Sequence, residues 1–259
     1  MTRTIIRTLF PLAAFLASCS PTVAGDTPPA TETKGVFAVT PLATLDAPWA
    51  IAVLPSGGVL VTEKAGKLKL INGTKTTVVT GAPQVDAGGQ GGLGDVVLAP
   101  DYAKSGVIYL SWVEASENDT RGAVIGRARL VVGESPRLEG LEVLWRQSPK
   151  VTGRGHFSHR IAFSPNGQLM YVASGERQKM DPAQDLSVNL GKVLRLLPNG
   201  KPAPGNPFAD KGGVGAEIWT YGHRNILGLA FDPQGRLWDL EHGPSGGDEL
   251  NLVEPGKNY

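Results

Sequence analysis

One motif recurs along this chain and constrains its fold more than any other feature. It consists of a short apolar run, a turn built on Pro-x-Gly or a similar pair, and a second apolar run. Short apolar runs bounded by Pro and Gly are typical of β-strands, so each copy predicts a β-hairpin. The copies turn at Pro55, Pro100, Pro165 and Pro233.

Repetition of one hairpin motif at long intervals favours an all-β fold of the β-propeller kind, in which each blade buries its faces against its neighbours. A β-sandwich is the competing fold, but four copies of a single motif favour radial repetition. The 34 glycines and 20 prolines, with aromatic residues at only 7%, agree with many short strands and turns. We therefore expect a β-propeller domain over residues 36–259, with about four blades present.

The charge balance of the chain argues against a nucleic-acid partner. Lys and Arg number 25 and Asp and Glu number 24, which gives a formal net charge of +1. A surface that binds nucleic-acid phosphates shows a strong basic excess. The 259 residues, 41% of them hydrophobic, allow one large or two small globular domains.

The N-terminus has the features of an export signal. Arg3 and Arg7 form a charged segment before an apolar run over residues 9–17, which is too short to span a bilayer as a mature helix. Cys19, the sole cysteine, follows Leu-Ala-Ser in an arrangement that resembles a bacterial lipobox. We expect residues 1–18 to be a lipoprotein signal peptide and Cys19 to be the lipidated residue. A simple secretory signal is the alternative, and either would export the chain to the cell envelope or periplasm.

Residues 19–35 are rich in Pro, Thr and Ala and contain almost nothing to bury, which predicts a flexible tether. With a single cysteine, the chain has no internal disulfide.

The densest group of polar residues lies between Tyr221 and the C-terminus. Arg224 offers donors in a fixed fork and Asn225 both donates and accepts, so the pair suits an anionic, oxygen-rich ligand. The glycine-rich loop that follows His242 can leave backbone carbonyls free, and carbonyls beside carboxylates suit Ca²⁺. A glycine-rich turn with ordinary surface charges is the alternative.

Three other motifs lie between the repeats. The glycine-rich loop over residues 88–95 holds one amide side chain, Gln90, that could reach a planar ligand, with a flexible hairpin tip as the alternative. His156 lies in a loop and, as histidine is the usual general base at neutral pH, is a candidate base or else a surface residue. Glu176 and Arg177 are interpreted as charged turn residues of the scaffold.

All four histidines fall within these polar motifs, which raises the question of zinc. No pair has the spacing of a helical HExxH site, and no cysteine is nearby. The sequence therefore argues against zinc. The four are His156, His159, His223 and His242.

Together these motifs resemble the soluble PQQ-dependent sugar dehydrogenases, the glucose/sorbosone dehydrogenase family that includes the bacterial aldose sugar dehydrogenases. The matching motifs are GQGGL, GHRN, EHGP-x-GGDE-x-N and the closing G-x-NY. The resemblance covers most of the chain after about Gly35. The chain departs from the family at Ser158 and His159, where small Gly residues are usual, so we expect the His159 imidazole to narrow or re-aim the substrate pocket.

The resemblance implies oxidation of an aldose at its anomeric carbon to the lactone, with pyrroloquinoline quinone (PQQ) and Ca²⁺ as cofactors. His156 would be the catalytic base, and Arg224 would stabilise negative charge that develops on the cofactor. Gln90, Arg224 and Asn225 would bind PQQ. The sequence does not identify the electron acceptor.

The resemblance also implies two calcium sites. The backbone carbonyls of Gly243 and Pro244 would bind the ion beside PQQ. Glu249 and the carbonyl of Tyr259 would bind a second, structural ion.

Members of this family close a ring of six blades, so about four blades predict a chain that is incomplete at its C-terminus. Two alternative functions stay open. One is a calcium-dependent sugar-lactone hydrolase, which would leave the GHRN and EHGP motifs unexplained. The other is an inactive, truncated lipoprotein that only binds a ligand or partner.

Overall fold

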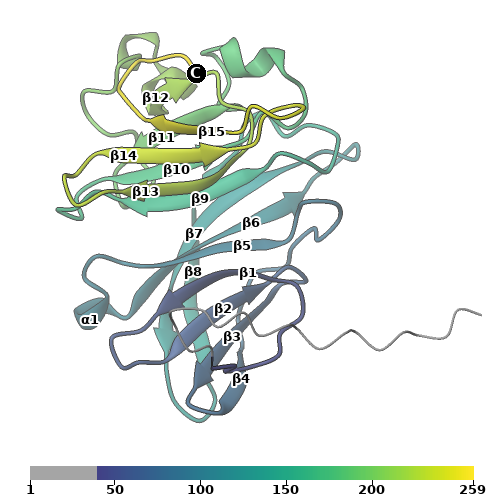
Figure 1. The fold of residues 1–259 in the computed structure, drawn as a ribbon, viewed down its shortest axis with the longest axis vertical. Coiled ribbons are helices and arrows are strands. Elements are labelled where there is room, and N and C mark those ends of the chain that lie inside the picture. The colour runs from purple at the N-terminus through teal and green to yellow at the C-terminus, as the bar shows by residue number, and fades with distance from the viewer. Residues whose placement is uncertain (1–39) are drawn as a thin grey trace, which may run out of the picture. The chain divides into compact units, whose positions relative to one another are not determined.

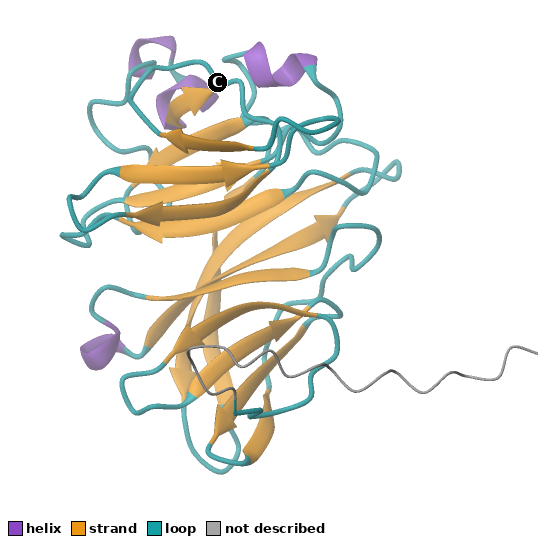
Figure 2. Cartoon of the chain, viewed as in Figure 1, coloured by secondary structure: helices purple, strands orange, loops and turns teal. Residues whose placement is uncertain are grey.

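The computed structural model describes residues 40–259. The expected signal peptide, the lipidated Cys19 and the tether over residues 19–35 lie outside the described residues. Within the described range the regular structure is almost entirely β (Figure 2). Its helices are too short and too polar to traverse a bilayer.

The strands form four antiparallel sheets, each in chain order (Figure 1). The first sheet contains β1 (Pro48–Val53), β2 (Val59–Glu63), β3 (Lys67–Asn72) and β4 (Lys75–Val79). The second contains β5 (Leu93–Leu98), β6 (Val107–Ala115), β7 (Arg121–Val131) and β8 (Arg137–Arg146). The third contains β9 (Ser158–Phe163), β10 (Met170–Ser174), β11 (Lys192–Leu196) and β12 (Ile218–Tyr221). The fourth contains β13 (Ile226–Phe231), β14 (Leu237–Glu241) and β15 (Glu249–Leu252).

The short helices lie in the connections between strands. They are α1 (Tyr102–Ser105) and the 3₁₀ turns η1 (Asp181–Gln184), η2 (Ala209–Lys211) and η3 (Gly213–Glu217).

The first strands of successive sheets lie side by side, β1 against β5, β5 against β9 and β9 against β13. Each sheet runs outward from this inner row, and three apolar cores fill the spaces between consecutive sheets. Full burial of one Leu or Ile side chain contributes about 1.5–3 kcal/mol, so each interface is held mainly by such residues. This is the packing of propeller blades, and it confirms the prediction of an all-β propeller with four blades present rather than a sandwich. Buried core residues include Leu60 and Leu110, Ile125 and Leu194, and Val193 and Leu237.

The Pro-x-Gly turns close three of the four hairpins in the same way. Gly57, Gly167 and Gly235 all have positive φ angles, between 71° and 87°, which glycine adopts without steric cost. The second sheet differs, because helix α1 connects β5 to β6 where the motif predicts a simple turn. Gly106, with a φ of 66°, ends this helix in the left-handed conformation typical of a helix C-terminus.

Alanine substitutions at three glycines would separate the cost of the φ angle from the cost of crowding. A Cβ at Gly167 would lie 2.6 Å from Pro100, whereas nothing lies within 4 Å of one at Gly57 or Gly133. Gly133, unlike the other two, has no positive φ. We expect Gly57→Ala to lower the free energy of unfolding by about 1–2 kcal/mol and Gly167→Ala to lower it further. Gly133→Ala should stay within about 0.5 kcal/mol of the parent in urea titrations. Equal losses in all three variants would contradict this.

Candidate active site

His156 and Glu176 form a buried pair at the start of the third sheet. Nδ1 of His156 is hydrogen-bonded to Oε1 of Glu176, and both side chains are buried. The second carboxylate oxygen of Glu176 accepts the backbone N–H groups of Lys179 and Met180, the latter at 2.6 Å. Burial raises the pKa of Glu176, but the Met180 N–H and the His156 imidazole outweigh it and lower the pKa overall. An ionised Glu176 accepts a hydrogen bond from the protonated Nδ1, which leaves Nε2 of His156 available as a base.

Glu176 is therefore more than the charged turn residue that the sequence suggested. Its neighbour Arg177 is also buried, with its guanidinium 3.8 Å above the ring of Phe157. Arg177 donates to the carbonyl oxygens of Gly155 at 2.9 Å and Gly153 at 2.7 Å. Burial lowers the pKa of Arg177 to about 10, so it stays charged at neutral pH. Arg177 thus fastens the loop that leads into His156.

The loop that carries His156 has an unusual backbone conformation. His156, Ser158 and His159 have φ angles of 50°, 57° and 54°, in the left-handed region that favours glycine. Glycine would adopt these angles without strain. The loop keeps the same kind of conformation with larger side chains.

Gln90 lies in a tightly packed loop between β4 and β5. The side-chain Oε1 of Gln90 accepts a hydrogen bond from the backbone N–H of His156 at 2.7 Å. The backbone N–H of Gln90 donates to the carbonyl oxygen of Arg154, also at 2.7 Å. A Cβ at Gly88 or Gly89 would lie 1.7 Å or 2.4 Å from Arg154. The loop is therefore packed closely against Arg154, and this packing holds Gln90 against the loop that carries His156.

Arg224 and Asn225 occupy the turn between β12 and β13. Oε2 of Glu241 accepts both of their backbone N–H groups, at 2.7 Å and 3.2 Å. Nη1 of Arg224 donates to the carbonyl of His242 at 2.8 Å. The carbonyl of Arg224 accepts the N–H of Glu176 at 3.0 Å, which joins this turn to the His156 site.

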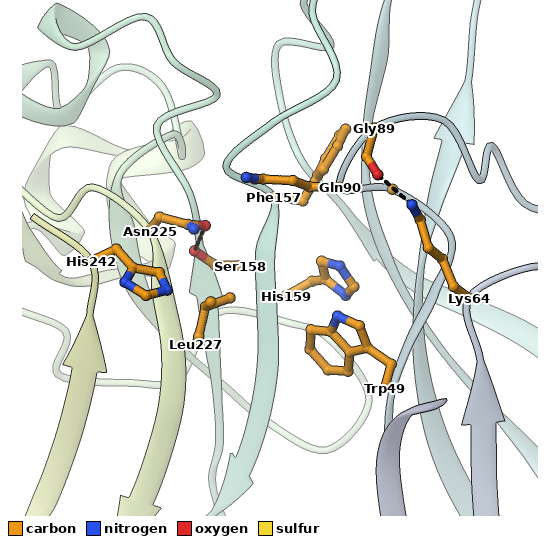
Figure 3. A pocket seen from close by; sticks show the side chains of 11 residues that line it. Trp49, Lys64, Gly89, Gln90, Phe157, Ser158, His159, Asn225, Leu227 and His242 are labelled. Carbon is orange, nitrogen blue, oxygen red and sulfur yellow. Dashed lines mark hydrogen bonds between the residues drawn. The ribbon is translucent and has the colours of Figure 1, made fainter. Parts of the chain in front are cut away.

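Two cavities receive these side chains. Gln90 and Asn225 line one of about 260 Å³, along with Lys64 (Figure 3). His156 and Arg224 line a second of about 390 Å³. The two cavities are neighbours. A hydrogen bond connects His156 of the larger cavity to Gln90 of the smaller one, and Arg224 and Asn225 are adjacent in the sequence. The structure thus brings the predicted catalytic and cofactor-binding residues together.

The four predicted calcium-binding residues separate into two groups. Pro244 lines the larger cavity beside Arg224, and Oδ1 of Asp248 accepts the N–H of Gly243 at 2.9 Å, which closes the loop. Glu249 is exposed on β15, opposite Glu241. The Tyr259 ring stacks on His223 with centroids 4.9 Å apart.

His159 turns away from the cavity of His156. Its Nδ1 lies 2.7 Å from Oγ of Ser111, and its ring stacks on Trp49 with centroids 5.0 Å apart. Gly94 leaves room for the ring, because a Cβ there would lie 1.9 Å from Cε1 of His159. His159 lines the smaller cavity with Gln90 instead. The expectation that the His159 imidazole narrows or re-aims the substrate pocket stays a prediction.

Fold and site together define a class of protein, the β-propellers with a polar ligand site formed by loops from several blades. Residues 45–259 match the model of the Glucose / Sorbosone dehydrogenase family, and the chain belongs to this family. The resemblance inferred from the motifs is thereby confirmed.

Individual relatives agree with this assignment. The chain is 42% identical over 219 residues to the aldose sugar dehydrogenase YliI of Escherichia coli (strain K12), over 83% of this chain and 58% of that protein. It is similar to the soluble aldose sugar dehydrogenase of E. coli in its apo-form, with a TM-score of 0.79, 42% identity and coverage of 83% and 62% of the two chains. It is also similar to the PQQ-bound form of aldose sugar dehydrogenase from Streptomyces coelicolor, with a TM-score of 0.75, 34% identity and the same coverage. The chain spans less than two thirds of the length of these relatives.

The buried His159 should make the fold sensitive to acid. Burial, and then the charges of Arg160 and Arg177, lower the pKa of His159 to about 3. The unfolded chain, with a histidine pKa of about 6.5, binds this proton more tightly, so folded-state stability falls as the pH drops from about 6.5 toward 3. We expect a loss of roughly 2 kcal/mol from this group between pH 6.5 and pH 5.

His159→Gln should lack that loss in urea titrations at the two pH values. The exposed His242, changed to Gln, is the matched control and should keep it. If the free energy of unfolding of the parent and of His159→Gln depended on pH in the same way, His159 would not be the source of the acid sensitivity.

Proposed function

We propose that this chain carries the active site of a PQQ-dependent aldose dehydrogenase, which oxidises a sugar at its anomeric carbon to the lactone. The observation that carries the proposal is the His156–Glu176 pair, which shares a cavity with Arg224. Membership of the Glucose / Sorbosone dehydrogenase family supports the same reaction class.

The residues present fit a planar, anionic quinone. Gln90 and Asn225 offer amide groups to one cavity, and the Arg224 guanidinium adjoins the next. Figure 3 shows Gln90 reaching from its loop toward the side of the cavity that holds Asn225. When bound, PQQ supplies the two-electron acceptor for the hydride from the sugar.

The Gly243–Pro244 loop fits a calcium ion. A Cβ at Gly243 would lie 2.2 Å from the carbonyl oxygen of Gly246 and 2.5 Å from that of Gly247, so several carbonyl oxygens gather in this loop. Hard oxygen donors of this kind suit Ca²⁺, which would act as a Lewis acid beside the quinone. Glu249 and the Tyr259 carbonyl remain our proposal for a second, structural calcium site.

The chain's own residues perform the proton chemistry. Nε2 of His156 accepts the proton of the anomeric hydroxyl as the sugar is oxidised. Glu176 holds the proton on Nδ1 and stabilises the imidazolium that forms, much as a carboxylate orients the histidine of a hydrolytic triad. The positive charge of the Arg224 guanidinium would stabilise negative charge that develops on the cofactor beside it.

We also propose, from the sequence alone, that the chain is exported to the cell envelope with a lipid anchor at Cys19. The electron acceptor would then be a component of that compartment. An aldose is the proposed substrate.

Substitution of His156 and Glu176 tests the mechanism. In the chain reconstituted with PQQ and Ca²⁺, His156→Ala should lower kcat for aldose oxidation by about 10²–10⁴-fold, since the base is lost. Glu176→Gln keeps the imidazole but removes the carboxylate that holds the proton on Nδ1 and stabilises the imidazolium. We therefore expect a smaller loss of kcat than in His156→Ala.

Glu217→Gln is the control, because Glu217 pairs with Trp145 outside both cavities. Absorbance of bound PQQ should be retained in all three variants. Full activity in His156→Ala would overturn the proposed base, and hydrolysis of a sugar lactone without PQQ would favour a lactonase instead.

A further inference from the structure

A second histidine gathers two carboxylates behind the turn of Arg224. His223, Asp239 and Glu241 place their ligand atoms within 4.8 Å of one another. Nδ1 of His223 lies 2.9 Å from Oε1 of Glu241 and 3.5 Å from Oδ2 of Asp239. Asp239 and Glu241 alternate along β14 and so share a face of the sheet. All three side chains are buried.

One oxygen of this cluster has no hydrogen-bond partner. Oδ2 of Asp239 is buried and unpaired, one of two such side-chain atoms in residues 40–259. A carboxylate oxygen withdrawn from water without a partner is strongly unfavourable, so buried carboxylates are normally paired or bind metals. The unpaired oxygen faces the His223 imidazole and indicates a positively charged group that would satisfy it.

The outward atom of each side chain is held by another residue. Nε2 of His223 lies 2.8 Å from the hydroxyl of Thr220. Nδ2 of Asn251 donates to Oδ1 of Asp239 at 3.2 Å. Oε2 of Glu241 accepts the two backbone N–H groups of the Arg224–Asn225 turn. Metal ligands are oriented in this way, with the atom that does not bind the metal fixed by a neighbour.

We propose that His223, Asp239 and Glu241 bind one divalent transition-metal ion, Zn²⁺ or Mn²⁺, through Nδ1, Oδ2 and Oε1. When the Thr220 hydroxyl accepts a hydrogen bond from Nε2–H, Nδ1 carries a lone pair that can face the two carboxylates. Donor atoms about 2.1 Å from one metal ion are about 3.0–3.4 Å apart. This is close to the 2.9 Å and 3.5 Å that separate Nδ1 of His223 from the two carboxylate oxygens. An imidazole with two carboxylates suits these ions, whereas Ca²⁺ takes oxygen ligands. The ion is distinct from the calcium ions proposed above, and this inference does not depend on the proposed function.

The position of the cluster gives the ion a role. Glu241 would bind it with one oxygen and hold the turn of Arg224 and Asn225 with the other. His223 also lines the cavity that Arg224 and His156 share, which offers a route for the ion and a place for a water ligand. The metal-free alternative is a protonated His223 shared by the two carboxylates.

The test uses the whole chain, stripped of metal with EDTA and titrated with Zn²⁺ and, separately, with Mn²⁺ against a chromogenic chelator. We expect one ion per chain and a rise in Tm on binding. Asp239→Asn, which removes the unpaired oxygen, should weaken binding by at least tenfold. Thr220→Val should weaken it by about 10–100-fold through loss of the partner that orients His223.

His242→Gln is the matched control, because His242 lies 3.6 Å from Asp248 on the surface and could bind metal adventitiously. It should leave the affinity unchanged. Co²⁺ in the parent protein should give visible absorption bands of a nitrogen-ligated site, a readout that does not depend on the folding of any variant. The proposal is overturned if the parent binds neither Zn²⁺ nor Mn²⁺ stoichiometrically, if Co²⁺ gives only the spectrum of the hydrated ion, or if the site is lost in His242→Gln.

Discussion

Hydrogen bonds that cross between consecutive sheets set the geometry on which the site depends. Each bond uses a side chain of one sheet and a backbone group of the next, so it fixes both the spacing and the register of the two sheets. Gln90, His156 and Arg224 come from loops attached to three different sheets, and their relative positions follow from that register. The bonds are Thr62 Oγ1 to Gly94 O at 2.6 Å, Ile161 N to Asp95 Oδ2 at 2.9 Å and Arg160 Nε to Leu227 O at 2.7 Å.

Two buried glutamates repeat one arrangement around the site. Glu176 binds His156 with one oxygen and two backbone N–H groups with the other. Glu241 does the same with His223 and the Arg224–Asn225 turn. Charge-assisted bonds of this kind are stronger than neutral ones, and they satisfy both oxygens of a group that would be unfavourable to bury alone. Each glutamate therefore connects a histidine to a loop that faces the cavities.

The sequence was sufficient for the fold because the strand motif is local. The turns at Pro55, Pro165 and Pro233 depend on a glycine two residues later, and this can be read directly from the chain. The second hairpin was predicted less well, since nothing in the motif at Pro100 indicates helix α1.

The candidate site was predictable only in part. Motifs pointed to Gln90, His156 and Arg224, which the structure brings together. The partnership of Glu176 with His156 and the orientation of His159 depend on how the second and third sheets pack, so no spacing along the chain reveals them. The His223 cluster was missed for a related reason. Rules for metal sites count residues along a helix, whereas here a turn and alternate positions of β14 supply the ligands.

The left-handed conformation of His156, Ser158 and His159 has a consequence for how the site forms. Each such residue is less favourable by roughly 1–2 kcal/mol than in an ordinary conformation, so the segment does not adopt this shape by its own preference. Contacts from Glu176, Arg177 and Ser111, on neighbouring strands and loops, impose it. The loop therefore becomes ordered only once the surrounding sheets have assembled, and its geometry is an all-or-none property of cooperative folding rather than of the local peptide.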